Sequence, residues 1–246
     1  MSDLEIHPIQ PTEDPESDLN PLLPTMPFII TLFAPRGGGK STIISNLVLK
    51  KEFYYGRFDV VYIMSNTIYN DKTSRFLKKK YKKTIFPKYN DSVIEAIMDE
   101  QRIDDSDNEE GQDIKVLLIL DDILGEMKPN SKIWSLLPIH RHLNVSLIFA
   151  GQIFRGHGFS PLLRNNLTAA IILKTTNQKE IDKMEEEFSG FTNFRKMLDY
   201  ATSERYSFLY LNLERQFAMK NFTQMLWDSR EKKNENTEFK EETDEK

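Results

Sequence analysis

Short apolar runs rich in β-branched and aromatic residues alternate along the chain with segments of helical periodicity. The apolar runs predict strands at residues 28–33, 59–64, 116–120, 146–150, 169–174 and 207–211. The helical patterns between them fall at residues 40–51, 91–102, 131–142 and 178–188. Several strands are apolar throughout, as is typical of a parallel sheet covered by helices on both faces. The alternation predicts an α/β fold, a doubly wound and mainly parallel sheet flanked by helices.

The two ends of the chain lack this periodicity. Residues 1–26 hold several prolines among scattered acids and predict a flexible, Pro-rich acidic arm. Residues 229–246 are charged and almost free of apolar side chains, so they predict a disordered tail. One folded domain is then expected over residues 27–228, a usual size for an α/β unit. Within it, the acidic segment 104–113 predicts an exposed loop.

Composition narrows the possible classes of protein. Lys and Arg total 33 against 38 Asp and Glu, giving a net charge of −5, which excludes a wholly basic DNA-coating protein. Much of the acid lies in the two end segments and the 104–113 loop, so an inner surface can still be basic. The chain has no Cys, which excludes disulfides, thiolate metal sites and cysteine nucleophiles. No apolar run approaches the roughly 20 residues of a membrane span, and no membrane partner is expected.

A phosphate-binding motif follows the first predicted strand directly. The segment APRGGGKST meets the form GxxxxGK[ST] at every defined position except the first, where Ala34 replaces Gly. The glycines let backbone amides surround phosphates, Lys40 supplies positive charge to the β- and γ-phosphates, and Ser41 offers a hydroxyl to Mg²⁺. The assigned nucleotide-binding residues are Ala34, Pro35, Arg36, Gly37, Gly38, Gly39, Lys40, Ser41 and Thr42. A plain Gly-rich turn is disfavoured because a strand precedes the motif and an amphipathic helix follows it.

Polar residues also end two later strands. Asp121 and Asp122 follow the apolar run 116–120, at the end of the strand where α/β sheets bind ligands. We expect Asp121 in the Mg²⁺ shell and Asp122 to orient the attacking water, with a helix N-cap as the alternative role of Asp122. Glu126 is a weaker candidate for the same water. Gln152 follows the run 146–150, where it either senses the γ-phosphate or is an ordinary loop residue.

Taken together, these motifs resemble the FtsK/HerA superfamily of P-loop ATPases, in particular the poxvirus-type genome-packaging ATPases of large DNA viruses and their virophages. The resemblance covers residues 28–213. It is carried by the phosphate loop, the strand LLILDD, the segment RHLNVSLIFAGQ at 141–152 and the segment PLLRNNLTAAIIL at 161–173. It implies an ATP-hydrolysing translocase that packages double-stranded viral DNA into a capsid. Many members have Glu where Asp122 stands, so the water-activating residue stays open.

The resemblance implies further features of the sheet, the assembly and its partners. An ASCE-type (RecA-like) sheet has an extra strand between the phosphate-loop strand and the Asp-bearing strand. The subunits would form a homo-oligomeric ring, a hexamer or a pentamer, with ATP and Mg²⁺ at their interfaces. Arg164 and Arg141, with Arg155 behind them, are candidates for an arginine supplied in trans, completing a catalytic set with Lys40, Asp122 and Gln152. A capsid or portal component is an expected partner. The expected location is the viral factory in the host cytoplasm, and association with the virion is the alternative.

DNA contact and two alternative functions stay open at the level of sequence. Arg155 and His157 follow the Gln152 strand and are candidate DNA contacts, whereas the basic run 78–83 fits a solvated helix face at least as well. A P-loop nucleoside or nucleotide kinase shares the phosphate loop. A regulatory GTPase-like switch matches the DxxG form at residues 122–125, but the guanine-reading NKxD motif is missing.

Overall fold

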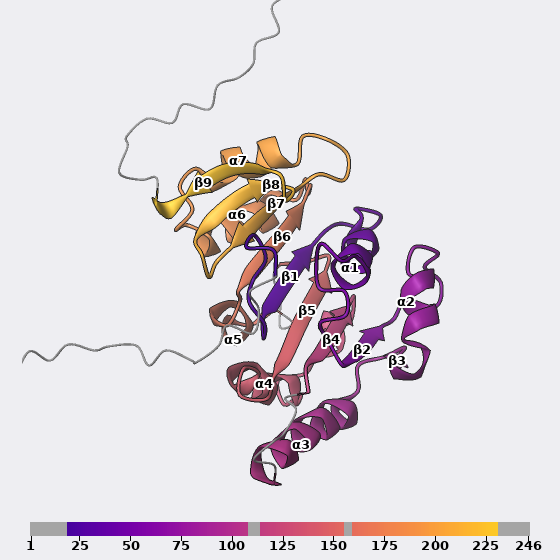
Figure 1. Ribbon diagram of the computed structural model, residues 1–246. Helices are drawn as coiled ribbons and strands as arrows, with labels where there is room; N and C mark the ends of the chain where they lie inside the picture. Colours follow the sequence, from indigo (N-terminus) through magenta and orange to yellow (C-terminus); the bar gives the residue numbers. More distant parts are fainter. Residues whose placement is uncertain (1–18, 108–113, 155–158, 231–246) are drawn as a thin grey trace, which may run out of the picture.

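A nine-stranded sheet forms the centre of the molecule (Figure 1). The structure is a computed structural model, and it describes residues 19–107, 114–154 and 159–230. The strands are β1 (Ile29–Phe33), β2 (Val60–Ser65), β3 (Ile85–Phe86), β4 (Val116–Asp121), β5 (Val145–Gly151), β6 (Ala169–Leu173), β7 (Phe208–Asn212), β8 (Phe217–Lys220) and β9 (Gln224–Asp228). Their order across the sheet is β3-β2-β4-β5-β1-β6-β7-β8-β9.

The sheet divides into a parallel part and an antiparallel part. Strands β3, β2, β4, β5, β1 and β6 pair in parallel. Strands β7, β8 and β9 extend the sheet beyond β6 with antiparallel pairing. The predicted α/β, mainly parallel fold is therefore confirmed. Strand β5 lies between β1 and β4, which is the extra strand expected for an ASCE-type sheet.

Helices pack against both faces of the sheet. The α-helices are α1 (Lys40–Leu49), α2 (Arg75–Lys80), α3 (Asp91–Asp107), α4 (Ile133–Leu136), α5 (Pro161–Asn165), α6 (Gln178–Glu187) and α7 (Phe194–Ala201). Single 3₁₀ turns are η1 (Lys82–Thr84), η2 (Leu124–Glu126) and η3 (Leu137–Ile139). Helices α3 to α7 contribute to one hydrophobic core, and α1 and α2 to the other. Among the described residues, no helix is both long and apolar enough to cross a bilayer.

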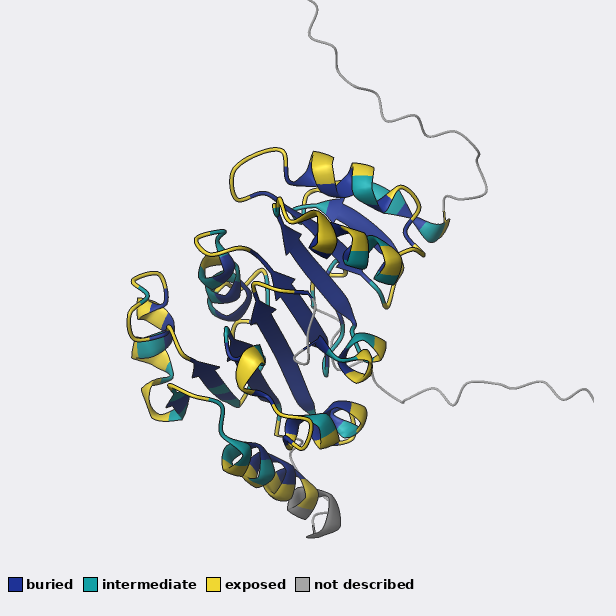
Figure 2. Cartoon of the chain, turned by 180° about the vertical axis from the view of Figure 1, so that it is seen from behind, coloured by how far each residue is buried: buried dark blue, intermediate teal, exposed yellow. Residues whose placement is uncertain are grey.

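The alternation of side chains along the strands separates the two cores. In β1, Ile29 and Phe33 belong to one core, whereas Ile30 and Leu32 belong to the other. Figure 2 shows the consequence: strands β1, β4, β5, β6 and β7 are buried along their length, and exposed residues gather on the outer faces of the helices. Burial of both faces explains why the parallel strands read as continuous apolar runs.

Two segments and several short elements differ from the sequence-based predictions. The helix expected at 131–142 is cut to α4 and η3, because Pro138 has no amide hydrogen to continue an α-helix. The loop expected at 104–113 begins later, since α3 continues to Asp107, and residues 108–113 lie outside the described part of the chain. The short elements β3, β8, β9, α5 and α7 were not predicted, and the helix offered as one interpretation of the basic run 78–83 overlaps α2.

The folded domain begins before residue 27. Leu23 is 2% exposed and joins the core under α1. The Tyr54 hydroxyl donates to the Pro24 carbonyl at 2.8 Å, and the Tyr210 hydroxyl donates to the Leu22 carbonyl at 2.7 Å. Residues 19–26 therefore pack onto the domain, which corrects the arm boundary expected at residue 26. Residues 1–18 and 231–246 lie outside the described part.

A core substitution tests this boundary. We expect Leu23→Ala to lower the free energy of unfolding by about 2–5 kcal/mol, because it removes buried methyl groups and leaves a cavity. The matched variant Leu162→Ala, at a leucine that is 38% exposed, should change it by less than about 0.5 kcal/mol. Urea denaturation of both variants measures the difference. Equal, small effects would show that residues 19–26 are not part of the domain.

Candidate nucleotide-binding site

The phosphate loop connects β1 to α1 at the carboxyl edge of the parallel strands. Gly39 stands at the N-cap position of α1 with φ 108°, a backbone conformation that residues with a side chain rarely adopt. The amides of Thr42 and Ile43 both donate to the Gly39 carbonyl at 3.1 Å, which starts the helix immediately after the loop. The amide groups and the dipole at this helix start favour an anion in the loop.

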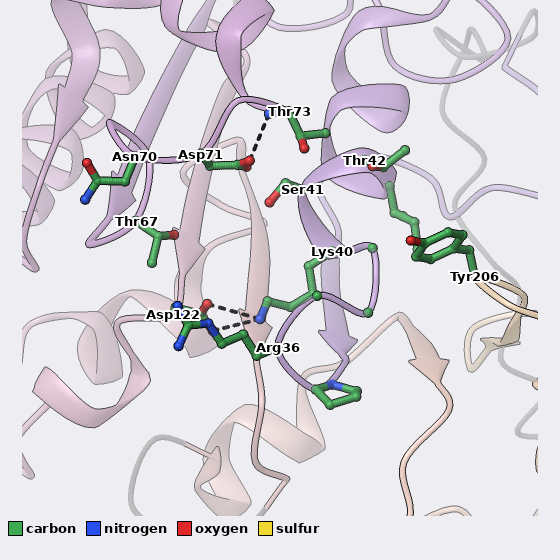
Figure 3. A pocket seen from close by; sticks show the side chains of 15 residues that line it. Arg36, Lys40, Ser41, Thr42, Thr67, Asn70, Asp71, Thr73, Asp122 and Tyr206 are labelled. Atoms are coloured by element: carbon green, nitrogen blue, oxygen red, sulfur yellow. Dashed lines mark hydrogen bonds and ion pairs between the residues drawn. The ribbon is translucent and has the colours of Figure 1, made fainter.

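A cavity of about 800 Å³ opens in front of this loop (Figure 3). All assigned loop residues except Ala34, which is buried, line it. Its other walls come from α1, from the segment after β2, from the end of β4 and from the turn before β7: Ile43, Thr67, Asn70, Asp71, Thr73, Asp122 and Tyr206. The cavity is within the size range of small-molecule sites in proteins.

Lys40 and Asp122 form an ion pair inside the cavity. Lys40 Nζ lies 2.9 Å from Asp122 Oδ1 and 3.1 Å from Oδ2, and only 7% of Lys40 is exposed. Asp122 has φ 55°, and its amide donates to the Ala150 carbonyl at 2.9 Å. Asp122 does not start an α-helix, since only the 3₁₀ turn η2 follows, so the N-cap alternative is not supported. The structure thus brings together the two groups that the sequence assigned to the γ-phosphate end.

Asp121 is buried beside this ion pair. Its Oδ2 accepts a hydrogen bond from Ser65 Oγ at 3.0 Å. Its Oδ1 is buried, and no group in the described part of the chain hydrogen-bonds to it. Burial, and then the negative charge of Asp122, raise the pKa of Asp121 to about 6. A carboxylate oxygen in this position suits a hard cation such as Mg²⁺, which prefers oxygen ligands. Asp121 and the Ser41 hydroxyl therefore fit the predicted metal-binding roles.

Asp71 is an acidic residue of the cavity that the sequence analysis missed. It accepts hydrogen bonds from the Thr73 amide at 2.8 Å and from Ser74 Oγ at 2.6 Å, and Figure 3 shows it near Ser41. Burial alone would raise the pKa of Asp71, but hydrogen bonds from Ser74, Ser41 and Thr73 outweigh it and hold the pKa below the ordinary value. The signal for Asp71 was the segment 65–74, which is rich in polar residues and follows the 59–64 strand directly.

The remaining predicted catalytic residues lie elsewhere. Gln152 is exposed and lines an adjoining cavity of about 370 Å³ with Pro35 and Arg36, not the phosphate-loop cavity itself. Glu126, the weaker candidate for the water, instead accepts hydrogen bonds from Asn66 Nδ2 at 2.6 Å and from the Tyr89 amide at 3.0 Å. It is not among the residues that line the phosphate-loop cavity.

The two arginine candidates lie away from this cavity. Arg164 on α5 pairs with Glu187 at 2.8 Å. Arg141 is exposed and precedes β5, at the opposite end of the strand from the phosphate loop. Neither arginine therefore lines the phosphate-loop cavity. Arg155 and His157 lie outside the described residues.

The sheet order and this site define a P-loop ATPase of the ASCE type, in which Asp121 and the phosphate loop flank a central strand. The chain belongs to the poxvirus A32 protein family, whose model matches residues 19–202. The resemblance to poxvirus-type packaging ATPases is thereby confirmed. This family membership favours the ATPase over the kinase and GTPase-like alternatives. A search of curated proteins found no significant match.

Solved structures share the fold at low sequence identity. The genome packaging NTPase B204 from Sulfolobus turreted icosahedral virus 2, in complex with sulfate, superposes with TM-score 0.55 at 16% identity, covering 80% of this chain and 97% of that one. Its complex with ATP-gammaS gives TM-score 0.53 at 18% identity, covering 80% and 98%. The pCW3 conjugation coupling protein TcpA gives TM-score 0.53 at 13% identity, covering 80% and 60%.

The raised pKa of Asp121 predicts a pH-dependent stability. A carboxyl whose pKa is about 6 in the folded chain, against an ordinary 3.8, stabilises the fold at pH values below 3.8 and loses that contribution as the pH rises through 6. Wild type should therefore lose about 2 kcal/mol relative to Asp121→Asn between pH 4 and pH 8. Urea denaturation of both proteins, with a chelator and no nucleotide, measures this difference. If the free energy of unfolding changed equally with pH in wild type and Asp121→Asn, the raised pKa of Asp121 would be contradicted.

Proposed function

We propose that this protein is an ATP-driven motor that moves double-stranded viral DNA into a capsid. The observation that carries the proposal is the Lys40–Asp122 pair in front of a glycine-rich loop, with the buried Asp121 beside it, in a chain of the poxvirus A32 family. This set supplies a cation for the phosphates, a candidate metal ligand and a carboxylate for a water molecule. Hydrolysis of a nucleoside triphosphate needs these groups in position and little covalent chemistry from the protein.

The Lys40–Asp122 ion pair suggests how binding of a nucleoside triphosphate prepares the site for its hydrolysis. A triphosphate held by the loop amides and the start of α1 would draw Lys40 toward its β- and γ-phosphate oxygens. Asp122 would then share or lose its contact with Lys40 and become available to accept a hydrogen bond from a water molecule. Attack of that water on the γ-phosphorus breaks the bond to the β-phosphate oxygen and yields ADP and phosphate. Mg²⁺, held by Ser41 and Asp121, would supply positive charge to the phosphate oxygens when bound.

The placement of the arginines supports a proposed ring. Arg164 and Arg141 lie outside the cavity of their own subunit, so any contact with a γ-phosphate would be made in a neighbouring copy. A ring of six or five subunits would provide such neighbours and enclose DNA. Arg155, His157 and the exposed lysines of the basic run are proposed to hold DNA phosphates by reversible electrostatics, which suits sliding. Gln152 would link the nucleotide to Arg155 and His157, which follow it in the sequence.

The proposed partners and location follow from the same role. A motor of this kind would dock on a capsid or portal component of the virus. It would act in the viral factory of the host cytoplasm, and it could remain with the virion.

The ATPase rate with and without DNA tests the motor. We expect double-stranded DNA to stimulate ATP hydrolysis several-fold, and added salt to weaken the stimulation because phosphate contacts release counterions. Lys40→Ala should lower the rate by at least about a hundredfold. Lys51→Ala, at an exposed lysine shortly after α1, is the matched control and should keep the wild-type rate. ATP hydrolysis that is indifferent to DNA, in protein assembled as a ring, would contradict the translocase.

Mixed assemblies test whether Arg164 acts in trans. We expect Arg164→Ala to lower the ATPase rate by about a thousandfold, the usual worth of such an arginine. Mixing Arg164→Ala with Lys40→Ala subunits should restore part of the activity, because an intact loop can then face an intact arginine. Glu187→Ala, which removes only the partner of Arg164, is the control and should remain active. Arg164→Ala rings with the wild-type rate would exclude Arg164, and Arg141→Ala is then tested in the same way.

A further inference from the structure

Tyr206 forms the wall of the phosphate-loop cavity at the end away from Asp122. Figure 3 shows the side chain of Lys40 directed toward Asp122, and the ring of Tyr206 on the other side of the loop, beside Thr42. The γ-phosphate end of the site is marked by Lys40 and Asp122. A triphosphate aligned on the loop therefore places its nucleoside at the Tyr206 end.

The position of Tyr206 is not explained by core packing. Its side chain is 55% exposed, although the ring is large and mostly apolar. Its backbone has φ 67°, a conformation that a bulky residue adopts only where the surrounding structure imposes it, and such residues gather at functional sites. An aromatic ring held in a strained conformation at the rim of a cavity is suited to contact a ligand.

The turn around Tyr206 is well supported. Ser207 Oγ donates to the Glu204 carbonyl at 2.8 Å, and the Glu204 carboxylate pairs with Lys220 at 2.6 Å. On the loop side, a Cβ added to Gly39 would lie 3.4 Å from Tyr206 Cδ1, so the ring sits against the loop backbone. The ring is thereby held beside the phosphate loop before any nucleotide binds.

Part of Tyr206 still faces the phosphate-loop cavity. The Arg205 guanidinium lies 4.7 Å from the centre of the Tyr206 ring. Arg205 lines a neighbouring cavity of about 400 Å³ rather than the phosphate-loop cavity, whereas Tyr206 lines both. The guanidinium therefore does not stand between the ring and the space in front of the loop.

We propose that Tyr206 is the stacking platform for the base of the bound nucleotide. The inference rests on the nucleotide binding contained in the proposed function and adds the residue that holds the nucleoside half. Aromatic stacking accepts any base, because every base has a π-face. Tyr206 should therefore strengthen the binding of purine nucleotides in general and contribute little to the choice between adenine and guanine.

Two substitutions at Tyr206 distinguish the loss of the aromatic ring from a disturbance of the turn. Tyr206→Asn removes the ring but suits the backbone, because Asn is enriched at positive φ, and Tyr206→Phe keeps the ring. Calorimetry with Mg²⁺ would measure the Kd of the ATP analogue ATPγS and of inorganic tripolyphosphate, which has no base. We expect Tyr206→Asn to weaken ATPγS binding by about 10- to 100-fold and tripolyphosphate binding by less than about twofold. Tyr206→Phe should stay within about twofold of wild type for both ligands.

A control variant and a second nucleotide complete the test of Tyr206. Tyr55→Asn, at a tyrosine that is 43% exposed and outside the cavity, should leave both affinities unchanged. The GTP analogue GTPγS should lose affinity by the same factor as ATPγS in Tyr206→Asn. Equal losses for ATPγS and tripolyphosphate would overturn the inference, because Tyr206 would then support the loop rather than the base. Unchanged ATPγS binding in Tyr206→Asn would overturn the role of Tyr206 but leave the proposed ATPase function standing. Wild-type protein that binds neither ATPγS nor tripolyphosphate would overturn the proposed function as well.

Discussion

The parallel pairing of β1, β5 and β4 is the constraint on which the rest of the site depends. Phe33 of β1 pairs with Gly151 of β5, and Ala150 of β5 pairs with Asp121 of β4, so the three strands end at the same edge. Two further hydrogen bonds continue this register beyond the strands: the Ala34 amide donates to the Gly151 carbonyl, and the Asp122 amide to the Ala150 carbonyl. Strand β5 thus aligns the phosphate loop with the two acids.

The charged side chains at this edge of the sheet favour the binding of an anion together with a metal cation. Lys40 and Asp122 are held as a close pair, and the neighbouring Asp121 keeps a buried oxygen that no described group satisfies. A buried carboxylate oxygen without a hydrogen-bond donor costs folding free energy, and a metal–phosphate ligand would offset that cost. The same groups that lower the stability of the fold therefore raise the affinity for a metal–phosphate ligand, as is common at functional sites.

The antiparallel extension contributes the other end of the site. Strand β7 pairs with β6, and the turn that precedes β7 carries Tyr206 to the phosphate loop. On the opposite side, the segment after β2 carries Asp71 toward Ser41. The cavity thus has one wall from each half of the sheet, and its central part is the loop that local sequence alone specifies.

The sequence by itself determined the local features. The glycines and Lys40 specify a phosphate loop, and uninterrupted apolar runs specify buried parallel strands, because both signals lie within a few consecutive residues. It missed the two-residue strand β3 and the partly exposed strand β9, whose patterns are too short or too weak. Only the tertiary structure decided that Asp122 pairs with Lys40 and that Asp71 and Tyr206 enter the site. Strand order and register bring these distant residues together, and no local periodicity encodes that order.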